Sequence, residues 1–288
     1  MVTVRHLILL LSLGLLGMSS SGSAGPAAAV SPNRATASLF AQSAVPLLNR
    51  DFPSADISFL LIDATTGRII ASRWESPEKP IPLGSLVKPF TALAYGEHHA
   101  FRYPMHICRG TSTGCWLPRG HGEIDLSAAI AYSCNSYFRD LTEKMTAADV
   151  VPTALRFGFD PPAPEARGPA LAGLGNLWLT SPLNMTHAYL ELVHNREMPG
   201  VPAILAGMSQ SAKQGTGAAV DRSLPFPDAL VKTGTASCTH AHHAPGDGFA
   251  LVMLPVDAPQ ILLLVRVHGV PGAQAAQVAG QMLSRLER

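Results

Sequence analysis

Pro82-Leu-Gly-Ser-Leu-Val-Lys-Pro-Phe90 is the stretch on which the interpretation of this sequence depends. Its first residues break the chain, and Leu86 to Gly96 has the apolar spacing of a buried helix, so we expect Ser85 at a helix N-terminus. Lys88 follows Ser85 by three positions, which places both side chains on one face of that helix. A serine hydroxyl needs a base held beside it to act as a nucleophile, and burial can make a lysine amine that base.

Two further motifs follow in order, Ser133-Cys-Asn135 and Lys232-Thr-Gly-Thr235. Each motif is common by itself, since Ser85 could simply cap a helix and Ser133 and Asn135 could be ordinary turn residues. The Lys232 motif could likewise be a plain edge strand. Their joint occurrence, in this order and in these local contexts, predicts an active-site serine acyltransferase.

The segments around these motifs carry a resemblance to a known family. Pro82–Phe90, Gly173-Leu-Gly-Asn-Leu-Trp-Leu-Thr-Ser-Pro-Leu183 and Gly215-Thr-Gly217 followed by Val231–Ala236 are similar to segments of the transpeptidase domain of penicillin-binding proteins. The same superfamily contains the serine β-lactamases. The resemblance covers about residues 56–288, which is most of the chain.

The resemblance implies a role for each catalytic position. Ser85 would be the nucleophile that becomes acylated, and Lys88 would be the general base for acylation. Ser133 would relay a proton between Lys88 and the leaving amine. Asn135 would hydrogen-bond the substrate amide and hold Lys88 in orientation.

The third motif would bind the substrate. Lys232 would supply positive potential for a substrate carboxylate and would lower the pKa of the lysine base. Thr233 and Thr235 would donate their hydroxyls to that carboxylate, and Gly234 would let the substrate backbone pass close to the strand edge. The backbone N–H groups of Ser85 and Thr235 would form the oxyanion hole.

The family resemblance also implies the substrate class. We expect an exported enzyme that acts on the D-alanyl-D-alanine end of peptidoglycan stem peptides, as a transpeptidase or carboxypeptidase, and that is acylated by β-lactams. A serine β-lactamase is one alternative, but Glu165-Ala-Arg-Gly-Pro169 lacks the Glu-x-x-Leu-Asn pattern of class A enzymes, and Thr180-Ser-Pro-Leu183 favours the transpeptidase branch. A non-catalytic muropeptide- or β-lactam-binding protein of the same fold stays open as a second alternative.

The N-terminus is predicted to direct export. Residues 1–24 have a basic residue, an apolar run from Leu7 to Met18 and a small-residue cleavage zone, as in a signal peptide. An uncleaved membrane anchor is the alternative, so contact with a membrane is expected only if this segment stays attached. Residues 25–55 are assigned to a tether and first helix, and 56–288 to the catalytic domain. The expected location is the periplasm or cell envelope.

The expected fold class is α/β (α+β). A hairpin is predicted from Ile57 to Ser72, three strands over 229–236, 248–254 and 261–267, and an amphipathic helix from Ala273 to Leu286. Strands at both ends with helices between them indicate a sheet whose terminal strands come together beside a helical lobe. The resemblance implies an antiparallel sheet flanked by helices, with the active site between the sheet and that lobe.

Nothing in the composition indicates a polyanion partner. The net charge is +1 and only 14% of the 288 residues are charged, with no basic run, so no nucleic acid is expected.

The four cysteines fit an oxidising compartment. A disulfide between Cys108 and Cys115 is expected across a polar, glycine-containing turn, while Cys134 and Cys238 could form a second bridge or stay buried thiols. The stretch Cys238-Thr-His-Ala-His-His243 has metal-ligand residue types, to which His121 could be added, but its spacing matches no zinc pattern. No metal and no cofactor are therefore expected.

Overall fold

The structure is a computed structural model that describes residues 32–238 and 245–287. It divides into two units, Met1–Ser38 and Leu39–Arg288. The signal peptide expected over residues 1–24 lies outside the described residues. The first described helix, α1 (Pro32–Asp51), begins inside the 25–55 segment assigned to a tether and first helix. Within the described residues, no helix has both the length and the apolar character to cross a membrane.

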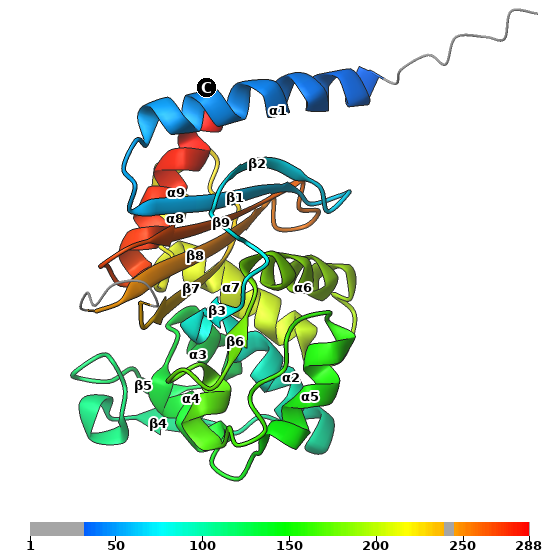
Figure 1. The fold of residues 1–288 in the computed structure, drawn as a ribbon. Coiled ribbons are helices and arrows are strands. Elements are labelled where there is room, and N and C mark those ends of the chain that lie inside the picture. The colour runs from blue at the N-terminus through cyan, green and yellow to red at the C-terminus, as the bar shows by residue number, and fades with distance from the viewer. Residues whose placement is uncertain (1–31, 239–244, 288) are drawn as a thin grey trace, which may run out of the picture. The chain divides into compact units, whose positions relative to one another are not determined.

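A five-stranded sheet organises the larger unit, with the strand order β2-β1-β9-β8-β7 and every neighbouring pair antiparallel. The strands are β1 (Ile57–Asp63), β2 (Ile69–Arg73), β7 (Leu230–Ala236), β8 (Asp247–Leu254) and β9 (Ile261–Val267). The hairpin and the three C-terminal strands are confirmed. Strands β1 and β9 are neighbours although nearly the whole chain separates them (Figure 1), so the two ends of the domain close one sheet.

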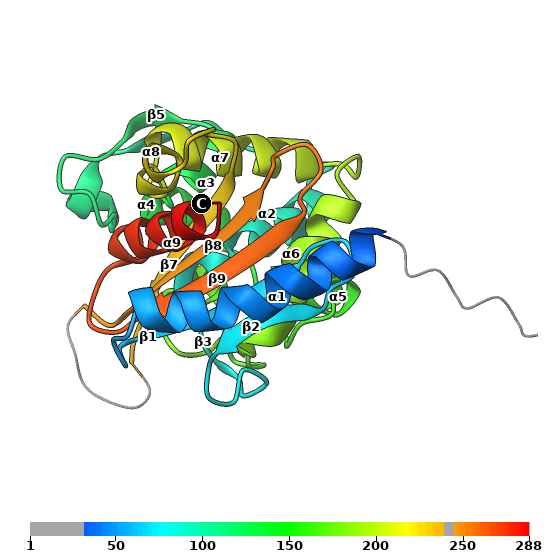
Figure 2. The same cartoon turned by 90° about the horizontal axis from the view of Figure 1, so that it is seen from above.

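The sheet is buried on both faces, because apolar residues occupy consecutive positions along much of its central strands rather than alternate ones. In β1, Leu60 and Ile62 belong to the core shared with the helical lobe. Phe59 and Leu61 belong to the core on the opposite face. That second face is covered by α8 (Ala219–Ser223) and α9 (Gly272–Leu286), and Figure 2 shows α9 lying along it.

The helical lobe fills the chain between β2 and β7 and packs below the sheet in Figure 1. Its α-helices are α2 (Lys88–His98), α3 (Leu126–Ala131), α4 (Asn135–Leu141), α5 (Ala147–Arg156), α6 (Pro182–His194) and α7 (Val201–Gln214). Three 3-10 turns accompany them, η1 (Gly84–Val87), η2 (Gly110–Thr113) and η3 (Gly168–Ala172). Two short two-stranded sheets complete the lobe, β3 (Ile81–Pro82) with β6 (Leu179–Thr180), and β4 (His106–Cys108) with β5 (Gly122–Ile124).

Local sequence signals set the helix starts. Ser181 caps α6, because its side chain accepts a hydrogen bond from the Asn184 backbone N–H at 3.0 Å and Pro182 occupies the first turn. Asp125 caps α3 in the same way through Ala128. Helix α3 delivers the chain to the second motif.

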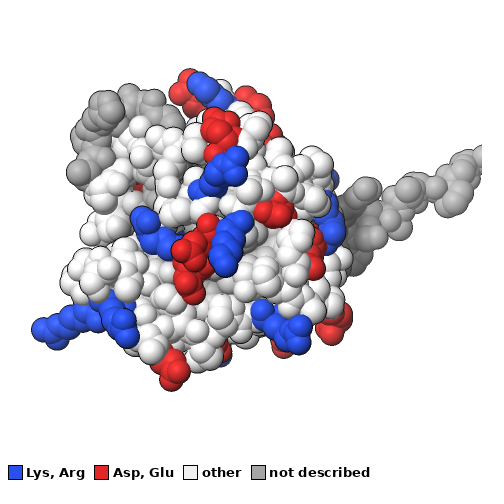
Figure 3. Space-filling model, turned by 90° about the horizontal axis from the view of Figure 1, so that it is seen from below, with Lys and Arg blue, Asp and Glu red and all other residues white. Residues whose placement is uncertain are grey.

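Charged side chains are sparse and of mixed sign on one face of the molecule. On the face drawn in Figure 3, Lys and Arg lie interspersed with Asp and Glu among a larger uncharged area. A face of this kind offers no continuous positive patch for a polyanion.

Candidate active site

Ser85 lies where the sequence predicts it, in the first turn of a helical segment. The short helix η1 contains Ser85 and leads directly into α2, which begins at Lys88. Ser85 is 8% exposed, whereas Lys88 is completely buried. Tyr189 on α6 donates a hydrogen bond to the Leu86 carbonyl at 2.8 Å, which anchors this turn to the helical lobe.

Two glycines allow strand β7 to lie directly against the Ser85 turn. Gly84 has a left-handed backbone (φ 58°), and a Cβ there would collide with the Thr235 carbonyl. A Cβ on Gly234 would lie 2.5 Å from the Leu83 carbonyl oxygen. The structure shows a further reason for glycine at position 234, because the third motif packs on the turn that carries Ser85. The expected role of Gly234 in admitting a substrate backbone stays a prediction.

Lys88 reaches from α2 to the second motif. Its Nζ donates hydrogen bonds to the Ser133 carbonyl at 3.0 Å and to Asn135 Oδ1 at 2.7 Å. Nζ also lies 5.2 Å from the ring centroid of Phe138 on α4. The predicted contact between Lys88 and Asn135 is therefore present. Among the described residues, no hydrogen bond joins Lys88 Nζ to Ser85 Oγ in this state.

Lys232 approaches Ser133 from the opposite side. This fully buried side chain donates to Ser133 Oγ at 3.0 Å and to the Thr233 carbonyl at 2.7 Å. The Ser133 hydroxyl thus accepts from Lys232, while its carbonyl accepts from Lys88. The three motifs, far apart in the sequence, converge on this one residue.

Both lysines have lowered pKa values. Burial lowers the pKa of Lys88 to about 7, and Arg139 contributes in the same direction, whereas Cys134 and Cys115 oppose the shift. Burial also lowers the pKa of Lys232 well below its usual range, and the charge of Lys88 adds to that shift. The sequence predicted that Lys232 would depress the pKa of Lys88, but the dominant cause is desolvation.

The second motif has an unusual backbone. Ser133 adopts a left-handed conformation (φ 49°), which is costly for a residue with a side chain and is concentrated at functional sites. Cys134 follows as the N-cap of α4, and its Sγ accepts a hydrogen bond from the Tyr137 N–H at 3.5 Å. This turn projects the Ser133 side chain toward Lys232 and that of Asn135 toward Lys88.

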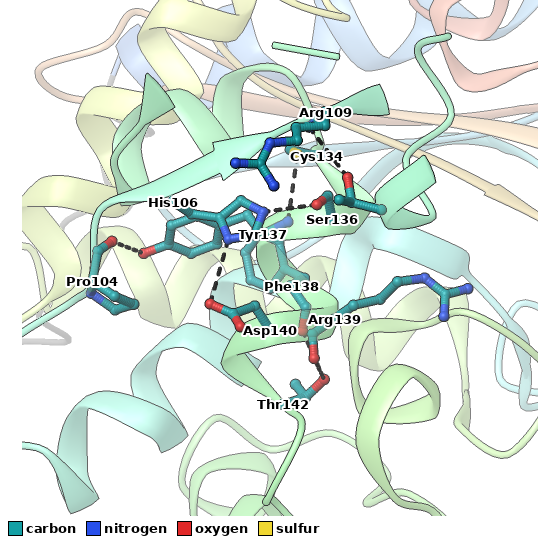
Figure 4. A network of polar contacts seen from close by, with 11 residues as sticks. Pro104, His106, Arg109, Cys134, Ser136, Tyr137, Phe138, Arg139, Asp140 and Thr142 are labelled. Atoms are coloured by element: carbon teal, nitrogen blue, oxygen red, sulfur yellow. Dashed lines mark hydrogen bonds and ion pairs between the residues drawn. The ribbon is translucent and has the colours of Figure 1, made fainter. Parts of the chain in front are cut away.

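Helix α4 is tied to strand β4 by a polar network (Figure 4). His106 Nε2 lies 2.7 Å from Ser136 Oγ, and its Nδ1 lies 3.4 Å from Asp140. Tyr137 donates its hydroxyl to the Pro104 carbonyl at 3.2 Å. The segment that carries Ser133 and Asn135 is therefore held by the β4–β5 region of the lobe.

Thr216 joins the site without having been predicted as a site residue. Its Oγ1 lies 2.6 Å from Thr233 Oγ1, so the predicted carboxylate-binding hydroxyl already has a partner. Thr235 is exposed, and its Oγ1 accepts from the Gly272 N–H at 2.9 Å, which leaves its own proton to donate. The sequence signal for Thr216 was the Gly215-Thr-Gly217 segment of the family resemblance, to which no role had been attached.

A hollow of about 330 Å³ is lined in part by Tyr132, the residue before Ser133. Its lining includes Trp116, Tyr132, Thr216 and Arg222. Trp116 is half exposed, and its indole N–H donates to the Tyr132 carbonyl at 3.1 Å. Trp116 thus forms part of the wall of this hollow.

The cysteine predictions need correction. Cys108, Cys115 and Cys134 are thiols in the structure, so the expected Cys108–Cys115 disulfide is absent from it. Cys115 Sγ instead lies 3.8 Å from Cys134 Sγ, and both Cys108 and Cys115 lie near His121. The thiols converge on a common point rather than pairing. The histidines of the Cys238–His243 stretch, at positions 240, 242 and 243, lie outside the described residues.

The comparisons with known proteins agree with this geometry. The family model described as "Penicillin binding protein transpeptidase domain" matches residues 57–286. Among curated proteins, no match was found.

Solved structures share the fold at low sequence identity. PBP2 of Pseudomonas aeruginosa, in complex with WCK 5153, has a TM-score of 0.69 at 17% identity over 86% of this chain and 73% of that one. PBP2 of Helicobacter pylori, solved as a complex with MreC, has a TM-score of 0.68 at 16% identity, over 84% of this chain and 62% of that one. The transpeptidase domain of penicillin-binding protein 3 from Burkholderia pseudomallei has a TM-score of 0.64 at 15% identity, over 88% and 92%.

These findings confirm the family and the fold class expected from the sequence. The antiparallel sheet, the helical lobe and three converging motifs all lie within the matched residues. The chain belongs to the penicillin-binding protein transpeptidase domain family.

Proposed function

We propose that the chain is a serine D,D-transpeptidase or D,D-carboxypeptidase that forms an acyl-enzyme at Ser85 with D-alanyl-D-alanine stem peptides. The observation that carries this proposal is the placement of two buried lysines on either side of Ser133, next to the Ser85 turn. A buried lysine with a pKa near 7 is an effective base at neutral pH, because half of it is already unprotonated.

The acylation step follows from this arrangement. Lys88 takes the proton of Ser85 Oγ as that oxygen attacks the carbonyl carbon of the penultimate D-alanine. The C–N bond to the terminal D-alanine then breaks, and Ser133 gives its own proton to the leaving amine. Protonated Lys88 then passes its proton to the Ser133 oxygen, which regenerates the neutral lysine amine and the Ser133 hydroxyl. Until that transfer, Lys232 stabilises the Ser133 oxygen through its hydrogen bond.

This relay requires one small rearrangement. In the described state, Lys88 contacts the Ser133 carbonyl rather than its hydroxyl. Catalytic hydrogen bonds are often formed only once substrate is bound. We infer that substrate binding brings the Lys88 amine between the Ser85 and Ser133 oxygens, with Asn135 Oδ1 as the pivot.

The substrate carboxylate would be bound at the exposed edge of β7. Thr235 offers an exposed hydroxyl there, and Thr233 lies two residues before it on the strand. Lys232 is buried and committed to Ser133 and Thr233, so its contribution to the carboxylate is long-range potential rather than direct contact. The backbone of Thr235 lies against Gly84, the residue before Ser85. This close approach supports an oxyanion hole formed by the backbone N–H groups of Ser85 and Thr235.

Slow deacylation distinguishes this proposal from a β-lactamase. A β-lactamase needs a second base beside the acyl ester. Among the described residues, no Asp or Glu hydrogen-bonds to Ser85, Lys88, Ser133 or Lys232, and Glu165 is exposed. We therefore place the chain with the peptidoglycan enzymes of the cell envelope, where its substrate occurs.

Intact-protein mass spectrometry after incubation with benzylpenicillin tests this proposal. We expect a stable adduct of the mass of the lactam, absent from the Ser85→Ala variant. An adduct lost within seconds while the lactam is consumed would indicate a β-lactamase. No adduct in a folded protein would leave the fold serving only as a binding module.

A further inference from the structure

The three thiols and the imidazole beneath the second motif form one compact cluster. Sγ of Cys108, Sγ of Cys115, a ring nitrogen of His121 and Sγ of Cys134 all lie within 4.8 Å of one another. The three cysteines are buried and the histidine is half-buried. Four ligand atoms from separate segments rarely converge in this way without a common partner, because buried thiols have little to gain from one another.

The distances within the cluster match those of a tetrahedral metal site. A zinc ion with bonds of about 2.3 Å to sulfur and about 2.0 Å to nitrogen holds sulfur atoms about 3.8 Å apart, and sulfur and nitrogen about 3.5 Å apart. Cys115 Sγ lies 3.8 Å from Cys134 Sγ. His121 Nδ1 lies 3.5 Å from Cys108 Sγ and 3.6 Å from Cys115 Sγ.

A disulfide explains this geometry less well. It would draw two sulfurs to about 2.0 Å and leave the third thiol and the imidazole without a partner. The hydrogen bonds available to the thiols are long and weak, so they do not account for the convergence either.

We propose that Cys108, Cys115, His121 and Cys134 bind a structural Zn²⁺ ion. Three thiolates and one imidazole are a closed set of four ligands that suits zinc and leaves no open position for catalysis. Binding releases the thiol protons and forms three Zn–S bonds and one Zn–N bond, with no change in oxidation state.

The ligands show what the ion would hold together. Cys108 ends β4, Cys115 follows η2 and His121 precedes β5, so three ligands come from the segment that joins β4 to β5. The fourth, Cys134, is the central residue of the Ser133-Cys-Asn135 motif and caps α4. The ion would hold the β4–β5 segment against the turn that carries Ser133 and Asn135. The ring of His121 stacks on Tyr132, one residue before that turn.

The site goes beyond the proposed acyl transfer and does not depend on it. The usual short spacings between zinc ligands are absent here, which is why the sequence did not reveal it. The expectation of no metal rested on the spacing within Cys238–His243, with His121 as a possible addition, and did not weigh Cys108, Cys115 and Cys134 as ligands. Nothing in the acylation steps is routed through the ion.

Metal content of the full chain tests the proposal. We expect about one zinc per chain by elemental analysis of protein purified in reductant without chelator. Native mass spectrometry should show the same ion bound, and Co²⁺ added to the metal-free protein should give intense thiolate-to-cobalt absorption. Wild-type protein that holds no zinc and takes up neither Zn²⁺ nor Co²⁺ when reduced would overturn the proposal, as would a disulfide within the cluster in protein as isolated.

Variants then assign the ligands. Cys115→Ser and His121→Ala should lose the zinc, whereas His121→Cys should keep it through a four-thiolate site. Cys238→Ser is the matched control, since it removes a cysteine outside the cluster and should keep the zinc. Loss of zinc in Cys238→Ser with retention in Cys115→Ser would show that the metal binds at another site and would refute the assignment. Penicillin acylation, measured in parallel, reports on the proposed function separately.

Discussion

The rate at which Ser85 is acylated should fall tenfold for each pH unit below 7, because the proposed base must be unprotonated to accept a proton. Burial lowers the pKa of Lys88 from 10.5 to about 7, which corresponds to about 5 kcal/mol of preference for the neutral amine. An exposed lysine would be neutral in only about one molecule in 3,000 at pH 7, whereas about half of Lys88 is neutral there. Desolvation thus supplies about a thousandfold more of the base form.

The sign of the effect follows from the direction of the shift. Protons bind Lys88 as the pH falls through 7, and the ammonium form cannot accept the Ser85 proton, so acylation slows in acid and levels off in mild alkali. At about pH 6 the rate should be about a tenth of its plateau, and at about pH 5 about a hundredth.

Stopped-flow measurement of the second-order rate constant for acylation by a fluorescent penicillin would check this profile. Circular dichroism at each pH controls for unfolding. A rate constant that does not change between about pH 5 and pH 8 would refute the assignment of Lys88 as the base, and an inflection near 10 would show that its pKa is not lowered.

Three further predictions concern the framework of the site. Gly84→Ala should lower the free energy of unfolding in denaturant by about 3 kcal/mol or more, because its Cβ collides with the β7 backbone. Gly67→Ala, also at positive φ but in open space, should lower it by about 1–2 kcal/mol. Equal losses of stability in the two variants would contradict the close packing at Gly84. Asn135→Ala should slow penicillin acylation by about 100-fold with little loss of stability, since it removes the side-chain acceptor that orients Lys88, and an unchanged rate would contradict that role. Tyr189→Phe should lower the free energy of unfolding by about 1 kcal/mol, because the Leu86 carbonyl loses its buried donor, and no loss would show that the bond adds nothing.

The sequence predicted the fold well where periodicity and family motifs agree. The apolar run Ile57–Ile62, the three C-terminal strands and the Ser181 cap all have strong local signals, and each is present in the structure. The sequence assigned residues 25–55 to a tether and first helix without predicting where the helix begins, and α1 occupies Pro32–Asp51.

Contacts between distant segments could not be predicted from local patterns. The role of Gly234 depends on the approach of the Leu83 carbonyl, about 150 residues earlier, which no local pattern records. The same holds for the cysteines, since a short polar turn between Cys108 and Cys115 suggested a disulfide. The fold instead brings in Cys134 and His121 from elsewhere in the sequence.

The sequence likewise could not predict which lysine contacts which oxygen of Ser133. The motifs predicted that Lys88, Ser133 and Lys232 would meet, and they do. Which lysine contacts the Ser133 hydroxyl depends on the left-handed backbone of Ser133, which turns its carbonyl toward Lys88 and its side chain toward Lys232.

Release of D-alanine from a stem pentapeptide ending in D-alanyl-D-alanine tests the central claim most directly. Mass spectrometry of the products, with and without an amine acceptor peptide, would show both hydrolysis and cross-linking. We predict that the wild-type chain releases D-alanine, through a peptide adduct that maps to Ser85, and that Ser85→Ala releases none. Release that persists in Ser85→Ala, or a folded wild-type chain that binds the peptide without releasing D-alanine, would contradict the account.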